Sequence, residues 1–167
     1  MIIINISFWL LVYFLAAVAV RLIPVSRFKP DRGIFRESAF EKKTRLYSLL
    51  RVEDWSKAFD GMVRMGGFEK GYFSQQVTVS NAAFLIRDAC VMESFHWMVL
   101  IAGGACFFLA PVVAASAMFA ANALISLTGI LCMRFSRRHI RNVRNLLANI
   151  NRANVKIVAQ KGLEWEE

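Results

Sequence analysis

The sequence predicts an all-α membrane protein with three transmembrane helices. These are an N-terminal anchor and a C-terminal helical hairpin, with a cytoplasmic segment of helices and loops between them and a basic amphipathic helix at the C-terminus. Two long runs, 2–20 and 97–133, contain no charged residue, and 57% of the 167 residues are hydrophobic. A helix crosses a bilayer with about 20 apolar residues. The first run fits one span, and the second is long enough for two short ones.

The first apolar run, about residues 2–22, is interpreted as a retained membrane anchor. The alternative is a cleaved signal peptide, because the small residues around Ala17 resemble a cleavage site. However, no Lys or Arg precedes the run, whereas signal peptides begin with basic residues. The second run is interpreted as two spans, about 95–110 and 112–133, because Pro111 lies where a turn is needed.

The charged residues lie in two segments that the spans separate. Residues 21–93 contain thirteen Lys/Arg and nine Asp/Glu, and residues 134–167 contain eight and three, so both segments are net positive. Basic segments beside membrane spans are typically cytoplasmic. We therefore predict that residues 23–93 and 134–167 are cytoplasmic and that the N-terminus is outside. The whole chain, 1–167, forms a single membrane domain in this interpretation.

The position of the basic residues also indicates the class of partner. A basic surface can bind nucleic acid, but here the basic residues adjoin membrane spans. Anionic lipid headgroups or phosphorylated substrates are therefore the expected partners, and nucleic acid is not. The predicted basic helix, residues 134–158, would bind either anionic lipid at the interface or the phosphates of a donor substrate.

One pair of ionisable residues stands where the chain enters the second apolar run. Glu93 and His96 are three residues apart, so a helix would place them on the same face. Ionisable residues at the edge of a membrane span are costly without a partner or a role, and so mark a candidate functional site. The alternative is that His96 only anchors the helix at the interface, beside the aromatic Trp97.

Other polar residues suggest further contacts, but none forms a metal motif. Asn122 and Ser126 are four residues apart in the last predicted span, where a buried amide needs a hydrogen-bond partner, either structural or in a substrate.

The three cysteines lack CxxC spacing and are interpreted as packing residues. A metal site from Glu93, His96 and His139 would lack a fourth ligand, so no metal and no bound cofactor is expected.

Taken in order, several short groups of residues resemble the glycosyl-4,4'-diaponeurosporenoate acyltransferase family of small bacterial membrane proteins. The resemblance covers about residues 23–147. The groups are Ile23-Pro24, Phe40-Glu41-Lys42, Arg51 with Trp55 and Asp60-Gly61, Gly66-Gly67-Phe68 with Lys70, Glu93 with His96-Trp97, and Arg134 with Arg137. The chain departs from the family pattern at residues 90–92, where members often have basic residues. This departure bears on the substrate more than on the chemistry.

The resemblance implies an enzyme of the bacterial inner membrane that transfers a fatty acyl group. The donor would be an activated thioester, either acyl-coenzyme A or acyl-carrier protein, used as a co-substrate. The acceptor would be a hydroxyl of a lipid or glycolipid, such as a glycosylated carotenoid. The rival class is a small membrane scaffold or accessory subunit without enzymatic activity, which basic flanks and a small-residue hairpin would serve equally well.

Acyl transfer to a hydroxyl needs a base for the hydroxyl and a group that stabilises the oxyanion. We predict His96 as the base and Glu93 as the carboxylate that orients its imidazole. Arg134 would stabilise the oxyanion or bind donor phosphate. No serine or cysteine obviously pairs with His96, which favours direct transfer. The remaining predicted substrate contacts are Lys70 and Arg137 for the donor, with Asn122 and Ser126 in the last span.

The predicted topology is tested by cysteine labelling in a variant that lacks the native cysteines. A thiol reagent that cannot cross membranes should not label Gly71→Cys in intact cells, because this position lies in a predicted cytoplasmic segment. It should label the same variant after permeabilisation. Labelling of Gly71→Cys from outside intact cells would contradict the three-span arrangement.

Overall fold

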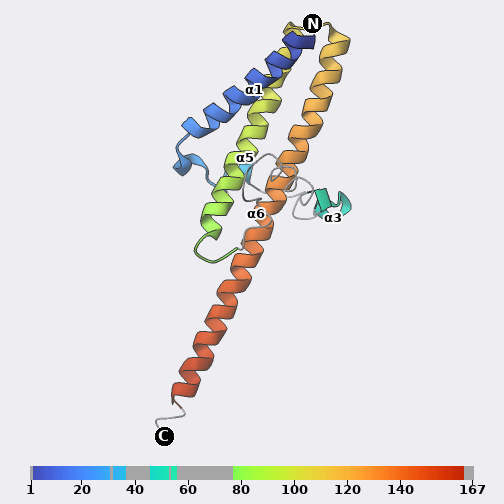
Figure 1. The fold of residues 1–167 in the computed structure, drawn as a ribbon. Coiled ribbons are helices and arrows are strands. Elements are labelled where there is room, and N and C mark those ends of the chain that lie inside the picture. The colour runs from blue at the N-terminus through green and yellow to red at the C-terminus, as the bar shows by residue number, and fades with distance from the viewer. Residues whose placement is uncertain (1, 31, 37–45, 53, 56–76, 164–167) are drawn as a thin grey trace.

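The computed structural model describes residues 2–30, 32–36, 46–52, 54–55 and 77–163. Its elements in chain order are α1 (Ile2–Leu22), η1 (Val25–Arg27), η2 (Gly33–Phe35), α3 (Leu46–Leu49), α5 (Ala82–Gly103), η3 (Gly104–Phe108) and α6 (Val112–Leu163) (Figure 1). None of the described residues forms a strand. The predicted all-α class is confirmed.

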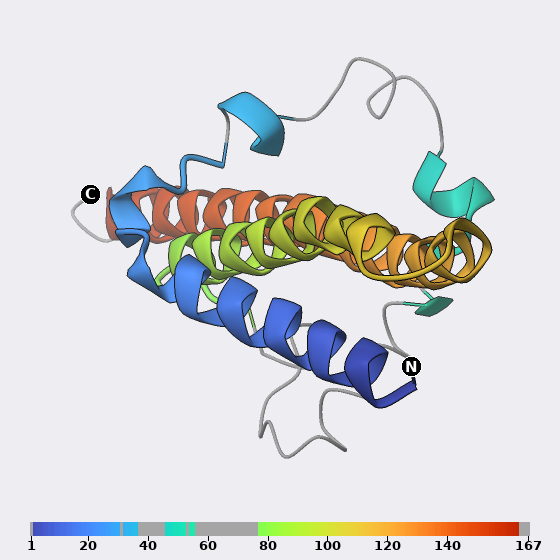
Figure 2. The same cartoon turned by 90° about the horizontal axis from the view of Figure 1, so that it is seen from above.

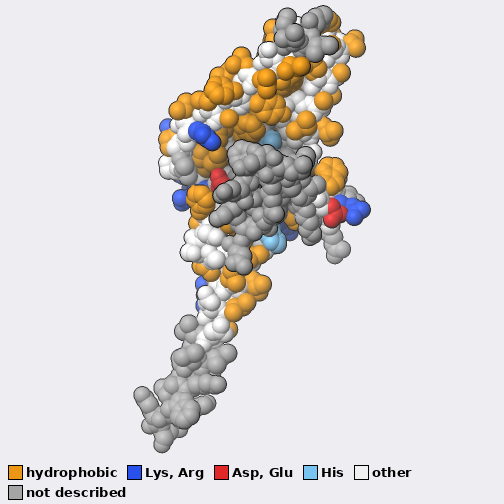
Figure 3. All heavy atoms as spheres, in the orientation of Figure 1, with side chains coloured by type: hydrophobic (Ala, Val, Ile, Leu, Met, Phe, Trp, Pro, Cys, Tyr) orange, Lys and Arg blue, Asp and Glu red, His pale blue; other side chains and the backbone are white. Residues whose placement is uncertain are grey.

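Among the described residues, three helical stretches are long and apolar enough to cross a membrane, which is the predicted number: Asn5–Leu22, Ala82–Phe108 and Val112–Asn154. Figure 2 shows α5 between α1 and α6, and α5 packs against both of them. Hydrophobic side chains cover the end of the molecule where α1 and the beginning of α6 lie, and the charged side chains visible on this face are farther down (Figure 3). The side-chain distribution therefore matches an apolar layer around the three helices.

The hairpin turns at the predicted place. Helix α5 ends at Gly103, and η3 continues the chain to Phe108. The backbone N–H of Ala115 donates to the carbonyl of Pro111 over 2.9 Å, which starts α6. Proline suits this position, because it has no N–H of its own to leave unsatisfied.

Asn81 is the N-cap residue of helix α5, but its side chain makes no cap hydrogen bond to the helix. The Asn81 side chain accepts a hydrogen bond from the backbone N–H of Thr78 over 2.8 Å, and the Thr78 hydroxyl accepts one from Asn81 N–H over 3.2 Å. This reciprocal pair forms the turn before α5. Local side-chain bonds of this kind compete with capping of the helix.

The predicted basic C-terminal helix is the continuation of the last span. Helix α6 contains 52 residues, so at 1.5 Å per residue it is about 78 Å long, against about 30 Å for a bilayer core. Figure 1 shows its C-terminal part projecting beyond the other helices. A large part of α6 therefore extends outside the apolar layer, without a break between the two parts.

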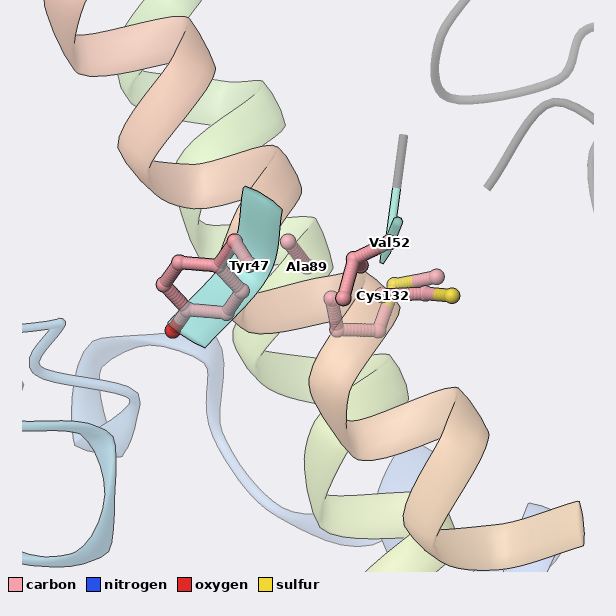
Figure 4. Close-up of a cluster of buried hydrophobic side chains, with 5 residues drawn as sticks. Tyr47, Val52, Ala89 and Cys132 are labelled. Carbon is pink, nitrogen blue, oxygen red and sulfur yellow. The ribbon is translucent and has the colours of Figure 1, made fainter. Parts of the chain in front are cut away.

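Three small hydrophobic clusters hold the helices together. Val12 and Ala16 of α1 pack with Val99 of α5. Ala82, Leu85 and Ile86 of α5 pack with Ile140 of α6. The third cluster brings a segment of the long connection onto the helices: Tyr47, Val52, Ala89, Cys132 and Met133 (Figure 4).

Gly103 lets α1 and α6 approach the end of α5. A Cβ atom at this position would lie 2.8 Å from both Nδ2 of Asn122 and Cη2 of Trp9. Gly103→Ala should therefore destabilise the protein by about 1–3 kcal/mol through overpacking. The free energy of unfolding in detergent micelles measures this effect.

Gly104→Ala is the matched control, because a Cβ atom there meets nothing within 4 Å. Its stability should be unchanged or slightly increased, since alanine loses less backbone entropy than glycine. Equal destabilisation by the two changes would contradict the close packing at Gly103.

Candidate functional site

A buried carboxylate lies where α5 and α6 cross. The side chain of Glu93 is fully buried, and both of its oxygens are bonded to arginines of α6. Arg134 Nε donates to Oε1 over 2.8 Å, and Arg137 Nη2 donates to Oε2. Trp97 Nε1, one turn further along α5, also donates to Oε1 over 3.4 Å. One carboxylate therefore holds two guanidinium groups and an indole.

Among the described residues, the charge balance of this cluster is positive, since two arginines face one glutamate. Isolated charges are very costly in an apolar environment, so such groups are paired or hydrogen-bonded when buried. Arg137 is only 4% exposed, and its second nitrogen, Nη1, lies 3.1 Å from Cys90 Sγ. Arg134 is partly exposed, with 17% of its side-chain surface accessible. Of the two guanidinium groups, that of Arg134 is the more accessible to a ligand.

The α6 arginines also bind the segment that follows α1. Arg134 Nη2 donates to the carbonyl of Ile34 over 2.7 Å, and Arg141 Nη2 donates to the carbonyl of Pro30 over 3.1 Å. The guanidinium of Arg137 lies over the ring of Phe35, 5.5 Å from its centroid. Gly33 has a φ of +60°, a backbone conformation that glycine adopts without strain. The arginines thus hold Pro30, Ile34 and Phe35 beside the Glu93 cluster.

His96 lies one turn from Glu93 and faces the backbone of α6. Its side chain is 5% exposed. A Cβ atom at Gly129 would lie 2.3 Å from Nε2 of His96, so the imidazole occupies the space that a side chain at position 129 would fill. The ring of Phe95 meets the imidazole edge to face, with centroids 5.4 Å apart. The imidazole is therefore enclosed between α5 and α6.

Gly129 is a site residue that sequence reasoning missed. It is one of nine glycines, and a lone glycine in an apolar helix has several ordinary explanations. Its place three residues after Ser126 was the only available signal, because these positions share a helix face. The structure supplies the reason for glycine, which is the His96 ring packed against this part of α6.

The two polar residues of the last span are both buried. The hydroxyl of Tyr13 donates to Oδ1 of Asn122 over 3.2 Å, which joins α1 to α6. Within the described part of the chain, Nδ2 of Asn122 and Oγ of Ser126 have no hydrogen-bond partner. By contrast, Ser94 Oγ and Thr128 Oγ1 each donate to the carbonyl four residues earlier. Asn122 and Ser126 therefore carry buried polar groups that a ligand could satisfy.

The other sequence candidates lie elsewhere. His139 is exposed and stacks on Phe135, with centroids 6.4 Å apart. No three of the described His, Cys, Asp and Glu side chains are grouped as a metal site would require. Lys70 lies outside the residues that the structure describes. The structure thus brings Glu93 together with Arg134 and Arg137, and places His96 one turn away against Gly129.

These features define a three-helix membrane protein with a buried carboxylate–arginine cluster and an enclosed imidazole at the crossing of two spans. Residues 31–146 match the family described as glycosyl-4,4'-diaponeurosporenoate acyltransferase. The match covers more than half of the chain, so the protein belongs to this family, and the resemblance seen in the sequence is confirmed. It includes α5 and the first part of α6, and therefore the whole cluster. No curated protein and no solved structure matches the chain.

Removing the charge of Glu93 should strongly destabilise the protein. Glu93→Gln keeps the size of the side chain but removes the charge that pairs with Arg134 and with the buried guanidinium of Arg137. Removing one partner of a buried ion pair costs about 3–5 kcal/mol. The free energy of unfolding in detergent micelles should fall by this order.

Asp54→Asn provides the comparison with an exposed ion pair. Asp54 and Arg51 are 2.8 Å apart, and their side chains are 54% and 79% exposed. Such pairs contribute up to about 1 kcal/mol. If Glu93→Gln lowers the free energy of unfolding no more than Asp54→Asn does, this result would contradict the structural importance of the buried cluster.

Proposed function

We propose that the protein is a membrane-bound acyltransferase that moves a fatty acyl group from a thioester donor to a hydroxyl of a lipid or glycolipid acceptor. The observation that carries this proposal is the buried imidazole of His96, one turn from the Glu93 cluster and inside an apolar span. Ionisable residues inside membrane spans are rare and usually functional. The family name supports the reaction class.

In the proposed reaction, His96 acts as the general base. A nitrogen of the imidazole takes the proton of the acceptor hydroxyl while the hydroxyl oxygen attacks the thioester carbonyl. The new C–O bond forms, the C–S bond breaks, and the proton passes to the departing thiolate. A positioned general base typically contributes about 10²–10⁴-fold to the rate. Burial between two helices fixes the ring and keeps bulk water away from it.

The contacts of Glu93 favour a role that differs from the predicted one. Its carboxylate is bonded to Arg134 and Arg137. We therefore assign it as a positioning residue that holds two guanidinium groups one turn from the imidazole. A fixed positive charge there would stabilise an oxyanion or bind the phosphates of acyl-coenzyme A or of a carrier protein. The partial exposure of Arg134 favours it for this contact.

The remaining proposed contacts follow the same pattern. Lys70 would add to the binding of donor phosphate, and Asn122 and Ser126 would contact substrate inside the membrane layer. Basic residues of α6 beyond the cluster, such as Arg144 and Arg152, would face anionic lipid of the bacterial inner membrane. No bound cofactor takes part in this scheme.

A second candidate function is that of a membrane scaffold without enzymatic activity. The contacts of the α6 arginines with Pro30, Ile34 and Phe35 favour it, because they join α6 to the segment after α1 without involving His96. In a scaffold His96 would only fill the space beside Gly129. The two candidates differ in what a change at His96 does to turnover when the protein remains folded.

His96→Ala should reduce acyl transfer by about 10²-fold or more, as loss of a general base does, while the protein still inserts and purifies. His96→Gln keeps a polar side chain of similar size and should be equally inactive, because an amide cannot accept the proton. The assay is acyl transfer by purified variants with equal thermal stability.

His139→Ala is the matched control, since this second histidine is exposed and lies on the other side of the cluster along α6. It should retain turnover. Near wild-type turnover in His96→Ala would refute the assignment of the base. If acyl transfer by the His96 variants falls only in proportion to the yield of folded protein, the scaffold function is favoured.

A further inference from the structure

A groove lies between α1 and the beginning of α6. Its volume is about 390 Å³, and its walls are mostly apolar: Asn5, Ile6, Trp9, Leu10, Tyr13 and Met118. Helix α1 packs mainly against α5, and the groove lies where residues of α1 and Met118 of α6 face one another. The groove lies within two of the stretches able to cross a membrane, so an apolar chain is the ligand that suits it.

A row of contacting side chains connects the groove to His96. The ring of Tyr13, which lines the groove, packs on Phe95 with centroids 5.9 Å apart, and Phe95 contacts the imidazole. On α6, Met118 of the groove is followed by Asn122, Ser126 and Gly129. These positions are three or four residues apart and share one helix face. The groove and the imidazole are thus joined by a path of contacting side chains, and the α6 positions from Met118 to Gly129 span about 16 Å at 1.5 Å per residue.

Two unsatisfied polar groups lie along this path. Nδ2 of Asn122 is a hydrogen-bond donor, and the hydroxyl of Ser126 can donate as well. Neither has a partner within the described residues, and both residues are at least nine-tenths buried. A buried donor without a partner is costly. The ligand that would satisfy both donors is a carbonyl oxygen, which accepts two hydrogen bonds.

The side chains along α6 follow the same order as the parts of an acyl thioester donor, which are the phosphates, the thioester and the acyl chain. Arginines lie at one end, the imidazole and the two polar groups lie in the middle, and the apolar groove lies at the other end. We propose that the fatty-acyl chain of the donor occupies the α1–α6 groove, with its thioester carbonyl directed to Asn122 and Ser126. This rests on the proposed function and assigns the groove to the donor rather than to the acceptor.

The groove is tested by filling it. Ile6→Trp and Met118→Trp place a large ring in the groove and should exclude the far end of a long chain. The probes are S-octyl and S-hexadecyl coenzyme A, thioethers that cannot transfer an acyl group. Both variants should bind the hexadecyl probe about tenfold more weakly, within the usual cost of overpacking, and the octyl probe as the wild type does.

Leu11→Trp and Leu124→Trp are the matched controls, because both leucines are exposed outside the groove. They should bind both probes normally. If the groove variants and the control variants bind the two probes equally well, the proposal is overturned, and the groove is then a site for bulk lipid. A raised acceptor KM with unchanged probe binding would also overturn it and assign the groove to the acceptor. Failure of the proposed function is distinct, because the wild type would then transfer no acyl group from either acyl-coenzyme A or acyl-carrier protein.

The carbonyl contact has its own test. Ser126→Ala and Asn122→Leu remove one donor each, and removing one oxyanion donor typically lowers kcat by about 10²–10³-fold. Binding of the thioether probes should not change, because they lack the thioester carbonyl oxygen. Weaker probe binding in step with lost turnover would show a structural role for these residues and overturn this part of the proposal.

Discussion

The buried carboxylate of Glu93 is the constraint on which the rest of the arrangement depends. Within a lipid layer, apolar packing gives helices little reason to prefer one register, since the surrounding lipid is equally apolar. The Glu93 carboxylate with its two arginine partners favours one register of the helices, because sliding one helix past the other would separate the paired charges. One of these partners, Arg134, also binds the backbone of Ile34, and Arg141, one turn beyond Arg137, binds that of Pro30. A single acidic side chain therefore sets the positions of α5, α6 and the segment after α1.

The helices could be predicted because a membrane span can be recognised in the sequence itself, as a sufficiently long run of residues without charge. Glu93 and His96 could be found for the same reason, since they are ionisable residues at the edge of such a run. Their surroundings could not be predicted. The arginines that pair with Glu93 lie 41 and 44 residues later, and hydropathy does not define the register between two helices. Gly129 was missed because its role exists only once the imidazole of His96 packs against it.

The substrates of the proposed reaction have charged parts and apolar parts, and these parts need different surroundings. Charged substrate groups are stable only near water, and acyl chains are stable only in hydrocarbon. Helix α6 carries guanidinium groups at Arg134 and Arg137 and polar groups at Asn122 and Ser126. A change from strongly charged to weakly polar to apolar surroundings thus occurs along one helix face. The imidazole of His96 lies at the middle of this change, where a thioester would meet both environments.

The unbroken course of α6 through 52 residues has an evolutionary consequence. All the α6 residues of the site belong to one rigid body, in which each residue turns the helix by about 100°. Inserting or deleting one residue between Asn122 and Arg137 would rotate the arginines away from Glu93 or the amide away from Tyr13. Substitutions in this stretch can be accommodated one at a time, but changes of length cannot. Variation in length among related chains should therefore be confined to the connections and to the far end of α6.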